Sequence, residues 1–303
     1  MISLPPNNAV LRRHTSSTPS SALSCIRFGE VLVLQGSPLL GALYALDRLT
    51  PAAAGKAALL AVGSCCLVGH VFVLNDWSGM NTDQRDPHRV STVFVNRGVS
   101  STTVGFLCIG FLALALVLLG ALGVLPLIMG LAIAGLSGLY SFPRAPMKGV
   151  PVLNSALHFA GGLLHFLLGY SVFATVDRRG IEIGCFFALL FVAGHLTHET
   201  RDSEADSANG IRTNAVAFGK NRSFLAGLIL FGLADSLLVT LALGGRVPLV
   251  LAVVGATYPL HAYWWVKALR KGLSFESVRW LQIRYRVLYA AVGMLMIVVR
   301  LGR

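Results

Sequence analysis

The chain has 303 residues, of which 55% are hydrophobic and only 13% are charged. A soluble globular domain carries about a quarter charged residues, so this composition excludes an ordinary soluble enzyme. The formal net charge is +12, but no separate soluble domain is present that could offer this charge to a nucleic acid. The five cysteines form no CxxC pair, which argues against a zinc site or a disulfide framework.

The first 24 residues differ in composition from the rest of the chain. They are rich in Ser, Pro and Asn, contain no acid, and include Arg12 and Arg13. No apolar core follows within them, so they do not form a secretory signal peptide. We expect residues 1–24 to be a disordered cytoplasmic tail, with an organelle transit peptide as the alternative. Residues 25–303 are expected to form one membrane domain.

Apolar runs long enough to cross a bilayer recur along this domain. They predict an all-α, polytopic membrane helix bundle with about nine transmembrane helices. The expected spans are residues 28–46, 55–75, 100–118, 121–141, 152–174, 181–198, 223–243, 247–267 and 285–301.

The basic residues are unevenly distributed between the connecting segments. Eighteen of the 25 Lys and Arg residues fall before the first span, or in the segments after the second, fourth, sixth and eighth spans together with the adjoining span ends. The positive-inside rule therefore places the N-terminus and these loops in the cytoplasm. A bacterial inner membrane is the expected location, and an organelle membrane is the alternative. The loop near Trp280, with six basic residues, is expected to lie against anionic lipid head groups.

An acidic stretch, NDWSGMNTDQRDP, follows the second span at residues 75–87. Asp76 and Asp83 are seven residues apart and share one face of a helix. Asp86 adds a carboxylate further along. Because Pro87 disfavours helix at the residue before it, we expect the helix to end there.

A second acidic stretch follows the sixth span at residues 199–210. If the helix continues through it, Glu199, Asp202 and Asp206 stand at i, i+3 and i+7 on one face. Carboxylates on one stripe repel each other unless a cation lies between them. Hard, oxygen-seeking ions such as Mg²⁺ suit such a site.

The two acidic stretches occupy matching places in the two halves of the chain, as an internal duplication would produce. Together they predict facing carboxylate stripes at the mouth of an apolar bundle. Mg²⁺ ions held there could clamp a diphosphate, and the apolar interior could accept a hydrocarbon tail. The sequence contains neither a GxxxxGK[ST] nor a strand-linked GxGxxG motif, so it indicates no site for ATP or NAD.

Three motifs in order resemble those of the UbiA superfamily of intramembrane prenyltransferases. The first stretch is similar to the family motif NDxxDxxxD, with Gly79 in place of the middle Asp. The second stretch, continued by GIRTNAVAFG at residues 210–219, resembles the family pattern DxxxxEGDxxxGxxSLPVAFG. The segment YSFPRAPMK at residues 140–148, followed by Asn154, resembles the family's segment between helices 4 and 5.

The resemblance implies a Mg²⁺-dependent transfer of a prenyl group from a polyprenyl diphosphate to an acceptor, which we expect to be aromatic. Metal binding is expected at Asn75, Asp76, Asp83, Glu199, Asp202 and Asp206. Of these, Asp76, Asp83, Asp202 and Asp206 are the expected catalytic set. Substrate contacts are expected from Asn75, Tyr140, Arg144, Lys148, Asn154 and Arg212. The expected partners are the prenyl diphosphate, a small-molecule acceptor and membrane lipid, without nucleic acid.

Two alternatives remain open at the level of sequence. Gly79 cannot bind a metal, which favours a non-catalytic relative that binds lipid or a partner. A secondary transporter would also place charges within a helix bundle. Transporter sites lie near the membrane midplane, whereas these acids lie at helix ends. The identity of the acceptor and the length of the prenyl chain are not readable from the sequence.

Overall fold

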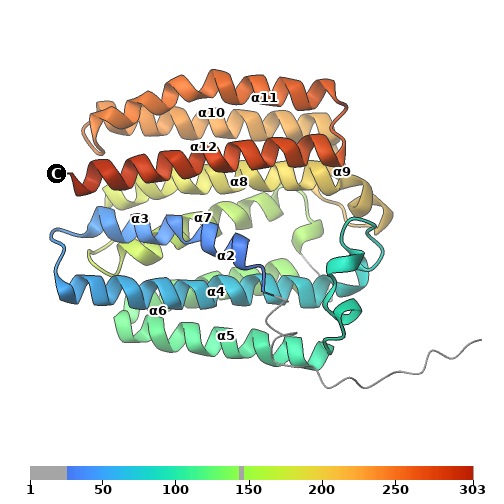
Figure 1. The fold of residues 1–303 in the computed structure, drawn as a ribbon, viewed down its shortest axis with the longest axis horizontal. Helices are drawn as coiled ribbons and strands as arrows, with labels where there is room; N and C mark the ends of the chain where they lie inside the picture. The colour runs from blue at the N-terminus through green and yellow to red at the C-terminus, as the bar shows by residue number, and fades with distance from the viewer. Residues whose placement is uncertain (1–25, 143–146, 303) are drawn as a thin grey trace, which may run out of the picture.

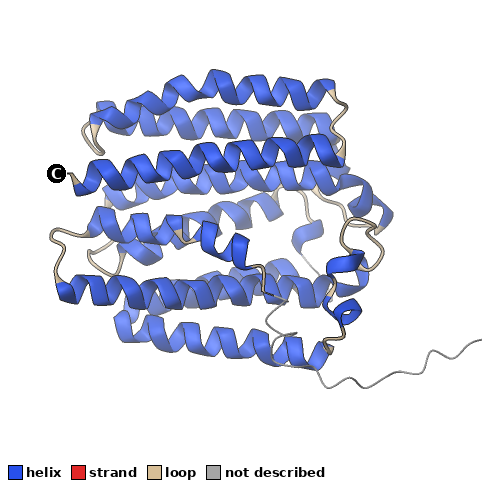
Figure 2. Cartoon of the chain, in the orientation of Figure 1, coloured by secondary structure: helices blue, strands red, loops and turns tan. Residues whose placement is uncertain are grey.

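The computed structural model describes residues 26–142 and 147–302. Within these ranges the protein is a bundle of roughly parallel and antiparallel helices without strands (Figures 1 and 2). The all-α membrane fold class predicted from the sequence is thereby confirmed. The tail predicted at residues 1–24, and Arg144, lie outside the described residues.

Nine helical rods succeed one another along the described chain. They are α2 (Phe28–Leu34) continued by α3 (Gly36–Ala45), α4 (Pro51–Asp83), α5 (Ser101–Leu122), α6 (Val124–Ser141), α7 (Leu153–Tyr170), α8 (Arg178–Ala208), α10 (Lys220–Leu243), η4 (Leu249–Thr257) continued by α11 (Tyr258–Arg270), and α12 (Phe275–Leu301). Short elements connect them: η1 (Val90–Thr92), η2 (Phe94–Arg97), η3 (Met147–Gly149) and α9 (Asn214–Phe218).

Eight of the nine rods are long and apolar enough to cross a membrane. The remaining rod, α7, has 18 residues and carries Asn154, His158 and His165. In α5, large apolar side chains point outward, for example Phe106, which is 72% exposed. A soluble protein would bury such side chains, so this surface faces lipid.

Two of the predicted spans are subdivided. The first changes direction at Gln35, between α2 and α3, and the Gln35 side chain donates a hydrogen bond back to the Val31 carbonyl at 2.8 Å. The eighth begins as a 3₁₀ helix, η4, and becomes α-helical only at Tyr258. Pro259 lies at that junction, and it lacks the amide hydrogen that an α-helix begun earlier would need there.

Side-chain caps define where several helices begin. Thr50 accepts a hydrogen bond from the Ala53 amide at 3.1 Å, and Pro51 occupies the first helical position of α4. Asp177 caps α8 by accepting the Gly180 amide at 2.7 Å. It also accepts the Tyr170 hydroxyl at 3.0 Å, so the end of α7 is tied to the start of α8.

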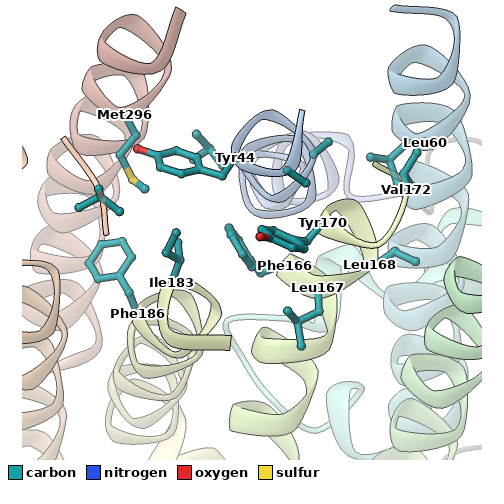
Figure 3. Packing of buried hydrophobic residues seen from close by; sticks show 14 of the residues in the cluster. Tyr44, Leu60, Phe166, Leu167, Leu168, Tyr170, Val172, Ile183, Phe186 and Met296 are labelled. Carbon is teal, nitrogen blue, oxygen red and sulfur yellow. The ribbon is translucent and has the colours of Figure 1, made fainter. Parts of the chain in front are cut away.

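The largest of three buried apolar clusters lies toward the end of the bundle at which α8 begins. Figure 3 shows Tyr44 from α3 and Phe166 from α7 packed beside Ile183 and Phe186 from α8, with Met296 from α12 closing the group. Contact between α3 and α7 is especially close, because a Cβ atom at Gly169 would lie 1.7 Å from the Pro38 carbonyl oxygen. Only glycine permits this approach of two backbones.

Helices α4 and α8 are the longest, with 33 and 31 residues. At 1.5 Å per residue each spans about 45–50 Å, whereas the bilayer core is about 30 Å thick. Their ends therefore project from the apolar region. Both acidic stretches occupy such projecting ends, α4 through Asp83 and α8 through Asp206.

Candidate active site

The carboxyl ends of α4 and α8 lie at the same end of the bundle, on the right in Figure 1. Asn209, which follows α8, donates a side-chain hydrogen bond to the Thr82 carbonyl oxygen near the end of α4, at 3.4 Å. The segment with η1 and η2, and the short helix α9, lie at this end as well. The two acidic stretches, more than a hundred residues apart in sequence, thus form one region.

Asp76 on α4 is paired with Arg27, which directly precedes α2. Arg27 Nε donates to Asp76 Oδ2 at 3.1 Å, and a second guanidinium N–H donates to Oδ1. The guanidinium also lies 5.7 Å from the centre of the Phe72 ring, one turn earlier on α4. The start of the first membrane helix is therefore fixed to the first acidic stretch.

Arg89 joins the two acidic stretches. Its guanidinium lies 3.4 Å from Asp83 and 3.5 Å from Asp86, and it donates to Asp202 on α8 at 2.5 Å. Burial lowers the pKa of Arg89, but Asp202 and Asp83 raise it more, so the net shift is upward. The cation that the facing carboxylates require is thus supplied by the chain itself in this state.

Asp86 lies outside α4, since the helix ends at Asp83 and not at the residue before Pro87. The chain leaves the helix through turns, with the Asp86 amide donating to the Asp83 carbonyl at 3.2 Å. The Asp86 side chain accepts the His88 amide at 2.8 Å and is buried. The helix therefore ends about one turn earlier than predicted, and Asp86 takes part in the turn that follows it.

On α8 the helix runs through the acidic stretch, as expected from the spacing. Glu199 is buried and accepts three hydrogen bonds: Asn154 Nδ2 at 2.5 Å, Asn214 Nδ2 at 2.9 Å and the Asn214 backbone amide at 3.1 Å. His195 Nε2 lies 3.2 Å away. Glu199 therefore holds α7, α8 and the start of α9 together, with its oxygens turned to these donors.

Asp202 lies between two arginines. Besides Arg89, it accepts two hydrogen bonds from its neighbour Arg201, at 2.6 and 2.9 Å. Arg201 also donates to Gln282 on α12 at 2.8 Å and lies over the Phe275 ring. These contacts bring the start of α12 to the acidic region.

Lys148, from the short element η3, reaches the stripe on α4 at the position of the missing carboxylate. A Cβ atom built on Gly79 would lie 3.6 Å from Lys148 Nζ and 3.7 Å from Asp83 Oδ2. Burial lowers the pKa of Lys148, and the charges of Asp83 and Asp206 offset part of that shift. An ammonium group thus stands beside the carboxylates of both helices.

A group of aromatic side chains lies further into the bundle than the acidic stretches. The rings of His158 on α7 and His195 on α8 are stacked at 3.6 Å with an angle of 13° between them. The Tyr140 ring lies edge-on to His158 at 5.0 Å. His158 Nδ1 lies 2.8 Å from the Asn154 carbonyl oxygen. Tyr140 and Asn154 therefore line the same region as the acidic stretches.

The remaining residues expected in the site lie at its edge. Asn75 is half-buried on α4 beside Asp76. Arg212 is exposed in the turn after α8, and its backbone amide would lie 3.7 Å from a Cβ atom built on Gly149. The turn that carries Arg212 thus borders the element that carries Lys148.

The chemistry of these side chains fits a hard divalent cation. Carboxylate oxygens are the donors that Mg²⁺ prefers, and they come here from two facing helix ends. Asp206 is half-buried, and its carboxylate makes no hydrogen bond or ion pair with the side chain or backbone of another described residue. In the part of the chain that the structure describes, no three acidic, His or Cys side chains converge as a ready metal cluster. Instead, the carboxylates form ion pairs with the guanidinium groups of Arg27 and Arg89.

Sequence reasoning did not assign Arg27, Arg89 or Asn214 to the site. The signal for Arg89 was available, since it is a cation three residues after Asp86 in the loop that follows the first acidic stretch. Nothing local marks Arg27, whose partner Asp76 lies 49 residues away. Asn214 resembles an ordinary residue of a helix start.

The model of the UbiA prenyltransferase family matches residues 37–283. A search of curated proteins finds no match. Among solved structures, the chain is similar to a UbiA homologue from Archaeoglobus fulgidus bound to GPP and Mg²⁺. The TM-score is 0.70 at 20% identity, over 92% of this chain and 100% of that one.

Two further structures share the fold. A digeranylgeranylglyceryl phosphate synthase gives a TM-score of 0.69 at 18% identity, over 94% of this chain and 99% of that one. The apo UbiA homologue from Aeropyrum pernix K1 gives 0.68 at 15% identity, over 89% and 98%. With the family model covering most of its length, the chain belongs to the UbiA prenyltransferase family and is an integral, multi-pass membrane protein.

Proposed function

We propose that the protein transfers a prenyl group from a polyprenyl diphosphate to an acceptor, in a Mg²⁺-dependent reaction at the cytoplasmic surface of the membrane. The main support is the meeting of carboxylates from α4 and α8 around Arg89 and Lys148, at one end of an apolar bundle. The metal ions of a bound diphosphate need the negative carboxylates, and its oxygens need the positive side chains. A hydrocarbon tail needs the apolar surroundings.

Asp76, Asp83, Asp202 and Asp206, with Asn75, are proposed to hold Mg²⁺, which when bound would neutralise charge on the departing diphosphate. Glu199, named from sequence as a further ligand, is proposed to support this set by positioning α7 and α9, since its oxygens accept Asn154 and Asn214.

Lys148 and Arg89 are proposed to contact diphosphate oxygens. Charge-assisted hydrogen bonds from such cations favour diphosphate as a leaving group. For Arg89 this requires exchange of a carboxylate partner for a phosphate oxygen. Tyr140, Asn154, Arg212 and Arg144 are proposed as the remaining substrate contacts, around the same region.

The donor and acceptor are proposed by class. The A. fulgidus homologues are described as bound to GPP and DMAPP, so short prenyl diphosphates are the donors to test first. An aromatic acceptor is proposed for the region of Tyr140 and the stacked imidazoles of His158 and His195, since a flat ring packs well against such side chains.

A non-catalytic, lipid-binding relative is the second candidate, and Gly79 is the observation that favours it. Mg²⁺-dependent pyrophosphate release separates the two. The purified chain with GPP, first alone and then with an acceptor panel, should release pyrophosphate, and Asp202→Asn and Asp206→Asn should each lower the rate of release by about a hundredfold or more. Glu182→Gln is the matched control, because Glu182 lies on α8 at the opposite end, paired with Arg178. Absence of release from the unaltered chain with every donor and acceptor would support the non-catalytic candidate.

The cytoplasmic orientation of the site can be tested by cysteine labelling. Ser91 and Ser207 are exposed at the acidic end of the bundle, and Thr175 is exposed in the loop at the opposite end. In a background without the native cysteines, an impermeant maleimide added to intact cells should label Thr175→Cys but neither Ser91→Cys nor Ser207→Cys. The reverse labelling pattern would place the acidic end of the bundle on the outer side of the membrane.

A further inference from the structure

Three cations surround one indole ring where α11 ends and α12 begins. Arg284 Cζ lies 3.7 Å from the centre of the Trp280 ring, Lys267 Nζ lies 5.1 Å away and Lys271 Nζ lies 5.9 Å away. Arg284 also donates to the Trp280 carbonyl oxygen at 3.2 Å, which holds its side chain against the ring. We call these four residues the Trp280 cluster.

The positive charge of this cluster is not balanced by the protein. Residues 267–286 contain six basic residues and a single acid, Glu276. None of the ion pairs in the described residues involves Glu276 or a cation of the cluster. Cations held this close repel one another unless an anion lies among them. The cation–π contacts offset only part of that repulsion.

Exposed apolar side chains continue from the cluster along both helices. On α11, Tyr263 lies one turn from Lys267 and is 60% exposed, and Leu260 follows at 47%. On α12, Ile283 and Val287 lie three and seven residues after Trp280 and are 55% and 66% exposed. Residues at these spacings share a face of a helix. Each helix thus presents cations at its end and an apolar strip leading away from them.

We propose that the Trp280 cluster binds the head group of an anionic phospholipid, whose acyl chains lie along the exposed strips of α11 and α12. The head-group phosphate would accept hydrogen bonds from Lys267 and Lys271, while the indole lies at the boundary between head groups and hydrocarbon. The apolar strips distinguish a lipid from free phosphate, which would use the cations alone. This site shares no residue with the proposed active site.

Binding at this corner would brace the start of α12. Phe275, in the first turn of α12, is stacked on His88 at 3.8 Å with an angle of 5°, and the Arg201 guanidinium lies over the same ring. His88 is adjacent to Arg89 in the loop after α4. A lipid that holds this end of α12 therefore also holds a neighbour of the acidic region.

Thermal unfolding of the full chain in micelles provides the test. The midpoint is measured with added phosphatidylglycerol, with phosphatidylcholine and with inorganic phosphate. Phosphatidylglycerol should raise the midpoint more than the other two. The double variant Lys267→Gln, Lys271→Gln should bind it about thirtyfold more weakly, from the usual contribution of a basic residue near an anionic head group.

The matched control is the double variant Arg48→Gln, Lys56→Gln. It removes the same charge from exposed positions at the opposite end of the bundle. It should respond to phosphatidylglycerol as the unaltered chain does. Trp280→Phe, a milder change, should weaken the response while the fold is kept. The proposal is overturned if the Lys267, Lys271 variant responds normally, if both double variants weaken equally, or if inorganic phosphate gives the same shift as the lipid.

Discussion

The two acidic helix ends carry similar stripes of carboxylates but are built in different ways. On α8, Glu199 and Asp202 are buried, and Glu199 is held by side-chain and backbone donors from α7 and α9. On α4, Asp76 and Asp83 are only partly buried and are paired with arginines from flanking segments. On α8, amides of packed elements fix Glu199, and Arg201, itself bonded to Gln282, fixes Asp202, whereas the α4 carboxylates are paired, within the described residues, only with arginines from segments outside the helix.

This difference suggests a division of labour within the proposed site. On α8, amides hold Glu199 and Arg201 of the same helix holds Asp202 before any substrate arrives, so these two carboxylates are pre-organised. The α4 carboxylates are paired with Arg27 and Arg89, which we propose exchange a carboxylate for a phosphate oxygen, and Lys148 lies beside them. Gly79 falls on the adjustable side, where loss of a carboxylate disturbs no packed network.

The largest expected effect is on catalysis. Asp202→Asn should lower the rate of prenyl transfer by about a hundredfold to a thousandfold, the usual result of removing a fixed electrostatic group. Asp76→Asn should cost less, because Asp76 belongs to the adjustable stripe. Initial rates with GPP at saturating Mg²⁺ measure both variants, and EDTA should abolish the rate in each. If Asp76→Asn lowers the rate more than Asp202→Asn does, the proposed difference between the two stripes is reversed.

The next effect is on stability. Glu199→Gln should lower the free energy of unfolding by about 1–3 kcal/mol, because an amide replaces an acceptor that faces three donors. Glu204→Gln on the same helix is the control, since Glu204 is exposed and, within the described residues, forms an ion pair with Lys220 alone. Loss of this ion pair should lower the free energy of unfolding by about 0–1 kcal/mol. Denaturant titration in micelles compares them, and equal losses would contradict the fixed character of the α8 stripe.

A pH effect should distinguish Lys148 from an ordinary surface lysine. A lysine is charged below its pKa, and burial lowers the pKa of Lys148. The KM for GPP should therefore rise on the alkaline side at a lower pH than the ordinary lysine pKa would give. Lys148→Arg should shift this rise of the KM to higher pH, since arginine stays protonated. If the alkaline rise of the KM is unchanged in this variant, the rise is caused by a group other than Lys148.

The smallest expected effect concerns Gly79. Gly79→Asp would place a carboxylate beside Lys148 Nζ and Asp83, where the space around a Cβ atom permits a side chain. It should lower the Mg²⁺ concentration for half-maximal activity about fivefold, the factor that corresponds to 1 kcal/mol. Gly79→Ala adds the Cβ atom alone and should stabilise the helix by about 1 kcal/mol without changing the Mg²⁺ demand. If the Asp variant instead impairs acceptor use alone, Gly79 makes room for the acceptor.

The helices and the two acidic stripes were predictable from the sequence because they depend on local properties. Apolar length predicts a membrane span, and the spacing of Glu199, Asp202 and Asp206 predicts a shared face once the residues are helical. The subdivision at Gln35 and the 3₁₀ start before Tyr258 were missed, since both depend on backbone hydrogen bonds that hydropathy does not report.

Only the tertiary structure decided what each charged group contacts. Arg89 meets Asp202 across 113 residues, and Asn214 turns Glu199 into a structural acceptor between three helices. Lys148 reaches the space left by Gly79 from η3, which packs against α6 and α7. Such pairings depend on how distant helices pack, whereas sequence spacing describes only one helix at a time. The sequence by itself determined which residues line each helix face, and the packing of the bundle determined which of those faces meet.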